Sequence, residues 1–487
     1  MQIHPLDQID FYKSGHFVQY PENTEVVFTN FTPRKSRIDS VNEMVFFGLQ
    51  YFIKEYLIAQ WDKNFFGKPK DEVVAQYKRR MENALGPGSL TYEHVAALHD
   101  LKFLPIKIHA LPEGTRVPMR VAPMVFYNTL SKFYWVTNYL ETILSTTLWG
   151  MCTSATTTFE YKKLLTEFAD LTVGNRDFVQ WQAHDFSFRG MFGFEAACMS
   201  GAAHLLSSTG TDSVHAIDFL EEYYNANSDI ELIGGSVPAT EHSVMCMGLQ
   251  DHEFETFERL ITKVYPKGIV SIVSDTWDFW QVITEYLPRL KPEILARDGK
   301  VVIRPDSGDP VLIICGDPNA TPGSPEFKGA IECMWETFGG TTTAKGYKLL
   351  DSHIGLIYGD SITTERAYRI LSNLEKKGFA SFNVVFGVGS YTYQYVTRDT
   401  FGIAVKATYG EVNGEPKNIF KTPKTDDGTK NSAKGLLAVF RTPQGELYMK
   451  NGATWNDVNN CEYRLVFENG HLLVDDTLAN IRQRLTI

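Results

Sequence analysis

The chain has 487 residues, of which 43% are hydrophobic and 22% are charged, a composition typical of a globular protein with a large buried core. This length predicts two or three domains. The net charge of -11 and the lack of a dominant basic stripe argue against general nucleic-acid binding.

Cysteine usage and the N-terminal residues predict the compartment. The six cysteines are scattered and form no C-x-x-C pair, so reduced thiols are expected rather than disulfides or a zinc site. Residues 1–17 have no basic flank and no apolar core, and no apolar run approaches the roughly 18 residues that a membrane span needs. We therefore expect a soluble, cytoplasmic protein without membrane contacts.

The N-terminal part mixes predicted strands and helices. A strand is predicted over 25–31 and a helix over 70–85. Ser40-Val41-Asn42-Glu43 has capping-box spacing and predicts the start of another helix. The basic turn at 34–37 is typical of a solvated surface, with an anion-binding patch as the alternative.

Further along, strands are predicted over 103–110 and 117–123, followed by a long helix over about 131–147. These elements indicate that residues 1–148 belong to an α+β domain with an antiparallel sheet. From residue 149 to 390 strands and helices alternate, which is typical of an α/β barrel.

Two features complete the expected architecture. The Pro-, Gly- and Thr-rich stretch at 316–344 is expected to be a surface loop. Residues 391–487 return to strands, with a hairpin signal at Glu468-Asn469-Gly470 and a closing helix over 478–485. We expect an α/β fold with a central (β/α) barrel, beside an α+β domain built from both chain ends.

The barrel prediction rests on apolar strands that end in loops rich in Gly, Ser and Asp. The β-branched run Val301–Ile303 stops at Arg304-Pro305-Asp306, where a cation and a carboxylate lie two residues apart. The same pattern follows the apolar runs 269–273, 354–358 and 383–386. The C-terminal rim of a barrel collects ligand groups from such loops. For Arg304 and Asp306 alone, a phosphate and metal site and a salt-bridged turn are equally good interpretations.

The loop HDFSFRG at 184–190 follows a predicted strand at 178–183 and combines a flat ring with a fixed cation. Phe186 offers a face on which an aromatic base can stack, although a core position is the commoner role of such a residue. Arg189 offers paired donors for phosphate. Asp212 supplies a carboxylate at the next turn, where a helix N-cap is the alternative interpretation.

The remaining strand-end loops predict anion and metal binding. Pro238 suits the first turn of a helix, which places Glu241 and His242 near an anion-attracting N-terminus. His242 is either a phosphate contact or phosphate acceptor, or a structural histidine. Asp278 and Asp306 are candidates to share a magnesium ion.

The loops at Gly359-Asp360 and Gly387–Ser390 come last in the barrel order, where barrels of this kind commonly bind phosphate. Together, the loops predict a ligand with a sugar, phosphates, a magnesium ion and a flat base. Those are the requirements of a phosphoribosyl transfer.

At this point the chain resembles the nicotinate and nicotinamide phosphoribosyltransferase family of NAD salvage. The matching motifs are, in chain order, DFYKSGHFVQYPENT, FFGLQY, YWVTNYLETIL, HDFSFRG, GTDS, SVPATEHS, VSDTWD, IRPDSGDP, GYKLL, Gly359-Asp360, FGVGS and VTRD. They run from Asp10 to past Lys421. No single motif is decisive, but their order makes the set specific.

The resemblance implies a barrel of the type II phosphoribosyltransferase kind and a nicotinamide phosphoribosyltransferase activity. Nicotinamide and phosphoribosyl pyrophosphate would give nicotinamide mononucleotide and pyrophosphate, with Mg²⁺ as cofactor. ATP would be a co-substrate, hydrolysed through a phosphohistidine. The protein would be a homodimer with shared active sites. The alternatives are a nicotinate phosphoribosyltransferase of the same fold and a non-catalytic dimeric binding or signalling protein.

The resemblance also implies how the base is held. Phe186 and, from the second subunit, Tyr12 would sandwich the pyridine ring. Asp212 would accept a hydrogen bond from the carboxamide, and Arg304 would contact the amide oxygen and the pyrophosphate. Because an ionised Asp212 repels the carboxylate of nicotinate, nicotinamide is the expected substrate.

Other residues are implied for the phosphates, the ribose and the metal. His242 would be the phosphorylated histidine, facing the pyrophosphate with Arg189. The implied metal and ribose ligands are Asp278, Asp306 and Asp360. The implied 5′-phosphate ligands are Gly389, Ser390 and, from the second subunit, Arg398 and Lys406. The remaining implied substrate contacts are Asp10, Ser236, Val237, Ser274, Gly359 and Lys421.

Two positions depart from the family pattern. Gly389-Ser390-Tyr391 stands where the family commonly has a glycine-rich run, so the approach of the backbone to phosphate is expected to differ. Ala404 stands where a phosphate-contacting serine is common, which removes one hydroxyl donor.

Overall fold

The computed structural model describes residues 3–359, 361–420 and 433–487. The chain folds into two compact units. Unit 1 comprises Met1–Thr156, Phe219–Ala226 and Val396–Thr486, and unit 2 comprises Thr157–Asp218, Asn227–Tyr395 and Ile487. The divisions lie a few residues beyond the expected limits of 148 and 390, and the first of them falls within the long helix α5 (Val136–Thr172).

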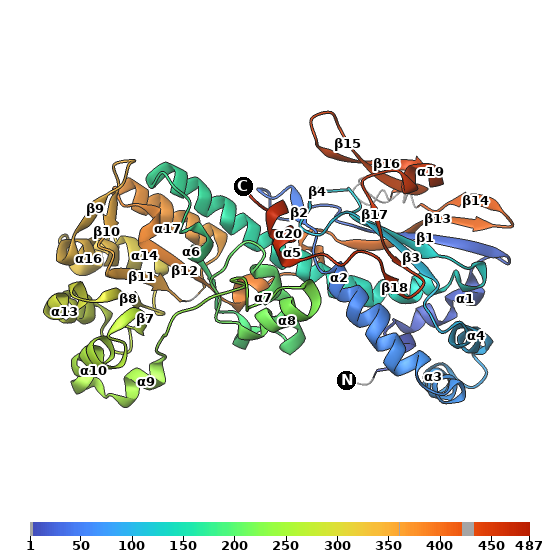
Figure 1. The fold of residues 1–487 in the computed structure, drawn as a ribbon, viewed down its shortest axis with the longest axis horizontal. Helices are drawn as coiled ribbons and strands as arrows, with labels where there is room; N and C mark the ends of the chain where they lie inside the picture. The colour runs from blue at the N-terminus through green and yellow to red at the C-terminus, as the bar shows by residue number, and fades with distance from the viewer. Residues whose placement is uncertain (1–2, 360, 421–432) are drawn as a thin grey trace. The chain divides into compact units, whose positions relative to one another are not determined.

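Unit 1 is built around a seven-stranded antiparallel sheet with the order β14-β13-β1-β5-β3-β17-β18. In chain order its strands are β1 (Thr24–Thr32), β3 (Ile106–Ala110), β5 (Met124–Asn128), β13 (Ala404–Val412), β14 (Glu415–Asn418), β17 (Arg464–Glu468) and β18 (His471–Leu472). Strands from both chain ends therefore share one sheet, as expected, with the three N-terminal strands in the middle and C-terminal strands at both edges (Figure 1). The predicted hairpin at Asn469-Gly470 is confirmed by the pairing of β17 with β18.

Smaller elements surround this sheet. Two antiparallel pairs join β2 (Glu43–Val45) to β4 (Arg116–Pro118), and β15 (Leu436–Arg441) to β16 (Leu447–Ala453). The helices of unit 1 include α1 (His16–Gln19), α2 (Leu49–Tyr51), α3 (Lys70–Leu85), α4 (Glu93–Leu101), α19 (Trp455–Asn459) and α20 (Leu478–Arg484). Helix α3 has the predicted bounds because Val73, Tyr77 and Met81 recur at four-residue spacing and are buried.

The prediction that a helix begins at Ser40–Glu43 is wrong. Glu43 begins strand β2 instead, and helical structure starts only at α2. There the buried carboxylate of Glu113 accepts hydrogen bonds from the backbone N–H groups of Gly48 and Gln50, at 2.8 and 2.6 Å. The cap thus comes from a side chain distant in sequence, which a local motif cannot reveal.

Unit 2 is built around a parallel five-stranded sheet with the order β6-β12-β11-β8-β7. Its strands are β6 (Ala183–Asp185), β7 (Lys267–Val273), β8 (Asp298–Arg304), β11 (Ile354–Tyr358) and β12 (Val384–Val388). Val301 and Ile303 on β8 are fully buried in the hydrophobic core of this unit. Val302 and Arg304 alternate with them and line the interior cavity.

Two further segments continue the sheet through isolated parallel bridges. Asp185 pairs with Thr211, Gly210 with Gly235, and Ala239 with Ser271 on β7. Residues 209–212 and 235–239 therefore connect β6 back to β7 and complete a ring. The predicted (β/α) barrel is confirmed, with these two segments as its irregular members.

Helices precede and follow the strands of unit 2. They include α6 (Val179–Gln182), α7 (Phe194–His204), α8 (Val214–Tyr224), α9 (His242–Met247), α10 (Glu253–Arg259), α11 (Phe279–Gln281), α12 (Leu287–Arg289), α13 (Lys291–Leu295), α14 (Pro310–Cys315), α15 (Pro325–Lys328), α16 (Ala330–Phe338), α17 (Thr364–Lys376) and α18 (Ser390–Gln394). Two short strands, β9 (Gly340–Thr342) and β10 (Lys348–Leu350), pair with each other. In the described part of the chain, no helix is long and apolar enough to cross a membrane.

Two expectations for unit 2 are wrong. The stretch 316–344 is not a loose loop, because it contains α16, whose Ile331 and Met334 are fully buried. The strand expected at 178–183 is the short helix α6 followed by β6.

Candidate active site

A cavity of about 410 Å³ lies inside the ring of unit 2. Apolar side chains from the strands form much of its wall, including Ile269, Val302, Ile357 and Val385. Polar groups from the strand ends complete it, namely His184, Asp212, Ser236 and Arg304. An apolar wall with a few convergent polar groups is the usual form of a small-ligand site.

Asp212 presents an ionised carboxylate to this cavity. Its Oδ1 accepts hydrogen bonds from His184 Nε2 at 2.9 Å and from Ser236 Oγ at 2.5 Å. Burial acts to raise the pKa of Asp212, but these hydrogen bonds and the charges of His184 and Arg304 outweigh it and lower the pKa. The side chain of Asp212 keeps 40% exposure, so an acceptor oxygen remains available to a ligand.

Phe186 supplies a flat wall of the same cavity. The Arg304 guanidinium carbon lies 6.0 Å from the centre of its ring, within the range of a cation–π contact. Gly387 on β12 makes room for this ring, since a Cβ there would lie 2.6 Å from Phe186 Cδ2. The position predicted for base stacking is thus inside the cavity, beside Asp212.

A charged cluster joins the ends of β7 and β8. Asp275 Oδ2 accepts a hydrogen bond from the backbone N–H of Asp306 at 2.8 Å, and His242 Nε2 lies 3.4 Å from Asp275 Oδ1. Arg304 Nε lies 3.5 Å from Asp306 Oδ1. The side chain of Asp275 is only 5% exposed, and its Oδ1 has no hydrogen-bond donor among the described residues. Sequence reasoning missed Asp275.

Asp278, the predicted partner of Asp306, has a different position. Its carboxylate caps helix α11 by accepting hydrogen bonds from Trp280 N at 2.9 Å and Gln281 N at 3.2 Å. The structure therefore brings Asp275 rather than Asp278 next to His242 and Asp306. The signal for this assignment was present in the sequence, because an aspartate directly before a helical segment is a typical N-cap.

His242 is the first residue of α9 and follows Glu241, the N-cap. The prediction that Pro238 lies in the first turn of this helix is wrong, because α9 begins four residues later, at His242. Pro238 lies in the segment that closes the ring, where its carbonyl accepts a hydrogen bond from Ser271 N at 2.9 Å.

The predicted phosphate loops lie close together. Arg189 is exposed in a 3-10 turn (Phe188–Gly190), and Gly389 is the N-cap of α18. A Cβ at Gly190 would lie 1.9 Å from Ser390 Oγ, so these two loops are in contact. A Cβ at Gly359 would lie 2.2 Å from Asp306 Oδ1, which places this glycine against the charged cluster.

The other predicted residues have varied positions. Val237 lines the cavity beside Ser236, whereas Ser274 is fully buried and donates its Oγ hydrogen to Ile272 O at 2.7 Å. Four predicted contacts belong to unit 1: Asp10, Tyr12, Arg398 and Lys406. Tyr12 is 65% exposed. Asp360 and Lys421 lie outside the described residues.

The candidate metal ligands in the charged cluster are the carboxylates of Asp275 and Asp306. The described residues contain no group of three or more His, Cys, Asp or Glu side chains arranged to hold a metal. Mg²⁺, however, commonly binds proteins through one or two carboxylates and completes its shell with phosphate oxygens and water. Asp306 and the buried Asp275 fit that requirement.

The fold has known relatives among solved structures. The nicotinate-nucleotide pyrophosphorylase of Pyrococcus furiosus superposes with a TM-score of 0.58 at 14% identity, covering 99% of this chain and 95% of that one. Human nicotinic acid phosphoribosyltransferase gives a TM-score of 0.52 at 14% identity, covering 98% and 92%. A parallel ring of this kind, accompanied by a separate α+β unit, defines the type II phosphoribosyltransferase fold.

Sequence comparison identifies the family. Residues 181–471 match the nicotinate phosphoribosyltransferase (NAPRTase) family, and residues 6–108 match the N-terminal domain of nicotinamide phosphoribosyltransferase. The chain belongs to the nicotinate phosphoribosyltransferase family. It is 55% identical to the nicotinamide phosphoribosyltransferase of Acinetobacter baylyi over 99% of this chain and 97% of that protein. The nicotinamide phosphoribosyltransferase of Mycoplasma pneumoniae is 34% identical, covering 88% and 93%.

Proposed function

We propose that this protein transfers the phosphoribosyl group of phosphoribosyl pyrophosphate to nicotinamide, releasing nicotinamide mononucleotide and pyrophosphate in NAD salvage. The observation that carries the choice of base is the ionised carboxylate of Asp212 on the cavity wall. It accepts an N–H from the carboxamide of nicotinamide, but it would face the carboxylate of nicotinate with a like charge.

The reaction forms one bond and breaks another at C1 of the ribose. The ring nitrogen of nicotinamide bonds to C1 as the bond from C1 to the pyrophosphate oxygen breaks, and the bonding electrons leave with pyrophosphate. The ring already carries the lone pair that attacks, so no proton must be removed. Phe186 and Asp212 orient the base, and Arg304 neutralises charge developing on the pyrophosphate.

Asp275 and Asp306 would hold a magnesium ion together with pyrophosphate oxygens. When bound, this ion would stabilise the leaving pyrophosphate. This assignment replaces Asp278, whose carboxylate is used in capping α11. His242 is the proposed phosphate acceptor from ATP, since its Nε2 lies beside Asp275 in the same cluster.

We also propose a homodimer in which Tyr12, Arg398 and Lys406 of one subunit complete the site of the other. Complementation tests this arrangement. Asp306→Ala and Lys406→Ala proteins should each be inactive, whereas mixing them with subunit exchange should restore about one quarter of wild-type activity. Persistent inactivity of dimers shown to have exchanged would contradict shared sites.

The proposed compartment is the cytoplasm. All six cysteines are free thiols, and four of them are buried, which suits a reducing environment.

Product analysis by chromatography tests the reaction. The purified protein would be incubated with phosphoribosyl pyrophosphate, Mg²⁺ and ATP, together with nicotinamide or nicotinate. We expect nicotinamide mononucleotide from the first base and little product from the second. Preferred formation of nicotinate mononucleotide would overturn the choice of base, and no product from either base would favour a non-catalytic binding protein. Omitting ATP tests whether its hydrolysis is coupled to the transfer.

A further inference from the structure

Tyr12 lies on a short 3-10 helix, Phe11–Gly15, and it is exposed. Two groups of the same segment lie beside its ring. The ring of His16 is 5.6 Å away between centroids, and the Lys13 ammonium lies 5.4 Å from the ring centre. Because both neighbours move with Tyr12, the direction of the ring depends on how residues 10–16, the N-terminal arm, are held in unit 1.

Lys13 is buried, in contrast to Tyr12. Its ammonium forms an ion pair with the carboxylate of Glu141 on α5, and the two side chains are only 4% and 16% exposed. A buried charge is unfavourable unless an opposite charge accompanies it. The N-terminal arm therefore cannot separate from α5 without leaving both charges unpaired.

Two further hydrogen bonds hold the arm on α5. Thr142 Oγ1 donates to Asp10 Oδ2 at 2.7 Å, and Asn138 Nδ2 donates to His16 Nδ1 at 2.8 Å. Asn138, Glu141 and Thr142 are spaced three and four residues apart and therefore share one face of the helix. This face contacts the arm at its first residue, in its middle and at its last residue.

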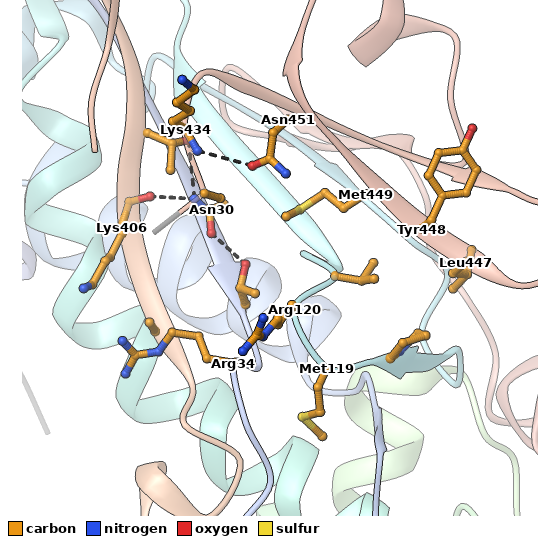
Figure 2. A pocket seen from close by; sticks show the side chains of 16 residues that line it. Asn30, Arg34, Met119, Arg120, Lys406, Lys434, Leu447, Tyr448, Met449 and Asn451 are labelled. Atoms are coloured by element: carbon orange, nitrogen blue, oxygen red, sulfur yellow. Dashed lines mark hydrogen bonds between the residues drawn. The ribbon is translucent and has the colours of Figure 1, made fainter. Parts of the chain in front are cut away.

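Glu141 also interacts with Lys406. Burial raises the pKa of Glu141, and the positive charges of Lys13 and Lys406 oppose that rise. Lys406 lies on β13, where its carbonyl accepts a hydrogen bond from Asn30 Nδ2 at 2.9 Å (Figure 2). Glu141 therefore interacts with both parts of unit 1 that the proposed dimer contributes to the second site, the N-terminal arm and β13.

We propose that Lys13 and Glu141 are positioning residues for the base, because they fix the N-terminal arm so that Tyr12 meets the pyridine ring in the site of the second subunit. The inference rests on the proposed function, from which it takes the homodimer and the contribution of Tyr12. The resemblance implied contacts for Asp10 and Tyr12, but it gave no role to Lys13 or Glu141. Aromatic stacking depends on the offset and tilt of the rings, so an arm held less firmly would weaken binding of the base.

Steady-state kinetics of full-length Lys13→Met protein test the proposal. Methionine keeps an unbranched side chain but cannot pair with Glu141. The KM for nicotinamide should rise about fivefold or more, whereas the KM for phosphoribosyl pyrophosphate should change less than about twofold. The matched control is Lys107→Met, which breaks the ion pair with Glu468 between β3 and β17 and should leave both KM values within about twofold. Equal rises in the two KM values of Lys13→Met protein would overturn the proposal.

A double variant separates positioning from a merely structural role. If Lys13 acts through Tyr12, then Tyr12→Ala already removes the ring that Lys13 holds in place. Adding Lys13→Met to Tyr12→Ala should therefore raise the KM for nicotinamide by less than about twofold more. Effects of the two substitutions that multiply would show that Lys13 acts independently of Tyr12, contrary to the positioning role.

Glu141→Gln covers the case in which Lys13→Met protein does not fold. Glutamine has nearly the same shape, and its amide oxygen still accepts a hydrogen bond from the Lys13 ammonium, so the buried lysine keeps a partner. Loss of the negative charge should raise the KM for nicotinamide about threefold, again without a further rise in a Tyr12→Ala background. An unchanged KM for nicotinamide in Glu141→Gln protein, shown to be folded by thermal unfolding, would contradict the role of the ion pair.

Mixed dimers distinguish failure of this inference from failure of the proposed function. Lys13→Met subunits mixed with a large excess of Asp306→Ala subunits enter mainly mixed dimers, in which the barrel of the Lys13→Met subunit meets an intact N-terminal arm. The KM for nicotinamide should then return to the wild-type value. A KM that stays raised, although Asp306→Ala and Lys406→Ala subunits complement each other, would refute this inference alone. Failure of that complementation would refute the shared site and this inference together, and no product from the wild-type protein would refute the reaction itself.

Discussion

At the scale of single residues, Asp212 makes the most specific prediction. Asp212→Ala should lower kcat/KM for nicotinamide and raise the relative use of nicotinate, because the repulsion of the second base is removed along with the acceptor for the first. Loss of a hydrogen bond to a charged group corresponds to about tenfold or more in kcat/KM. Steady-state kinetics with both bases would measure this. An unchanged ratio of the two kcat/KM values would refute the role of Asp212.

Two glycines on the same face of β11 and its loop form a matched pair. A Cβ at Gly359 would lie 2.2 Å from Asp306 Oδ1, so Gly359→Ala should displace this carboxylate and raise the KM for phosphoribosyl pyrophosphate about tenfold or more. The nearest atom to a Cβ at Gly355 is Lys300 Cδ, at 3.2 Å, on a flexible side chain that can move. Gly355→Ala should therefore keep near-normal kinetics. Equal KM values for the two variants would contradict the close approach of Gly359 to Asp306.

The residues of the candidate site were only partly predictable. Asp212, Phe186 and Arg304 could be anticipated because each lies in a turn or at a strand end and carries chemistry that the cavity now shows. Composition does not separate Asp275 from Asp278, since both lie in the loop after β7; only the position of Asp278 directly before a helical segment does. The difference depends on which carboxylate turns inward at the strand end, and that is decided by the start of helix α11 at Phe279, directly after Asp278.

At the scale of elements, a buried polar chain connects α18 to the ring. His204 Nε2 lies 3.0 Å from Gly210 O, which can only accept, so Nε2 carries the proton. Burial lowers the pKa of His204, and in the neutral ring Nδ1 then accepts a hydrogen bond from Tyr393 Oη at 2.6 Å. Gly210 precedes Asp212 by two residues, and Tyr393 belongs to the helix that begins at Ser390. These hydrogen bonds thus connect the segment that carries Asp212 with the predicted phosphate loop at Ser390.

Removal of the Tyr393 hydroxyl tests this connection. Tyr393→Phe should destabilise the protein by about 1–3 kcal/mol, because a buried nitrogen of His204 loses its donor. Tyr391→Phe is the control, since this ring is 53% exposed and the change should cost less than about 0.5 kcal/mol. Thermal unfolding would compare the two variants. Equal unfolding temperatures would show that the hydrogen bond contributes nothing.

Helices α10 and α11 contain a pH-dependent contact. Burial, and secondarily the charge of Asp278, raise the pKa of Glu253 to about 7. The pKa of this carboxyl is higher in the folded protein than in the unfolded chain. The folded protein therefore loses stability as pH rises between the two values, here from about 4.5 to about 7. The slope is at most about 1.4 kcal/mol per pH unit. Glu253→Gln should flatten this part of the stability curve measured by denaturant unfolding, and an unaltered slope would contradict the raised pKa.

Element boundaries followed from the sequence where local periodicity decides them, as in α3. They did not follow where a distant contact decides. The start of α2 depends on Glu113, and α16 is held by burial of Ile331 and Met334 in a core formed by many segments. Composition alone made the stretch around α16 resemble a loop, although its glycines and prolines lie outside the helices or, in the case of Pro325, at the first position of α15.

At the scale of the whole molecule, the two-unit architecture was predictable from the change in texture along the chain. Parallel strands buried on both sides are uniformly apolar, which distinguishes unit 2 from the alternating strands at both chain ends. The return of Phe219–Ala226 to unit 1 was not predictable, because the division falls inside helix α8, between Asp218 and Phe219.

The closure of the ring through isolated bridges has a consequence for local stability. Strand β8 is paired with β7 along its whole length and with β11 over Val301–Ile303, whereas residues 209–212 and 235–239 are held by single bridges. Local opening should therefore begin there, and the amide hydrogens of Thr211 and Gly235 should exchange with solvent faster than those of Val302 or Ile303. These are the segments that carry Asp212 and Ser236. Binding of the base should therefore slow hydrogen exchange most in residues 209–212 and 235–239, where the ring opens most easily. A bound base would thus stabilise the closed barrel.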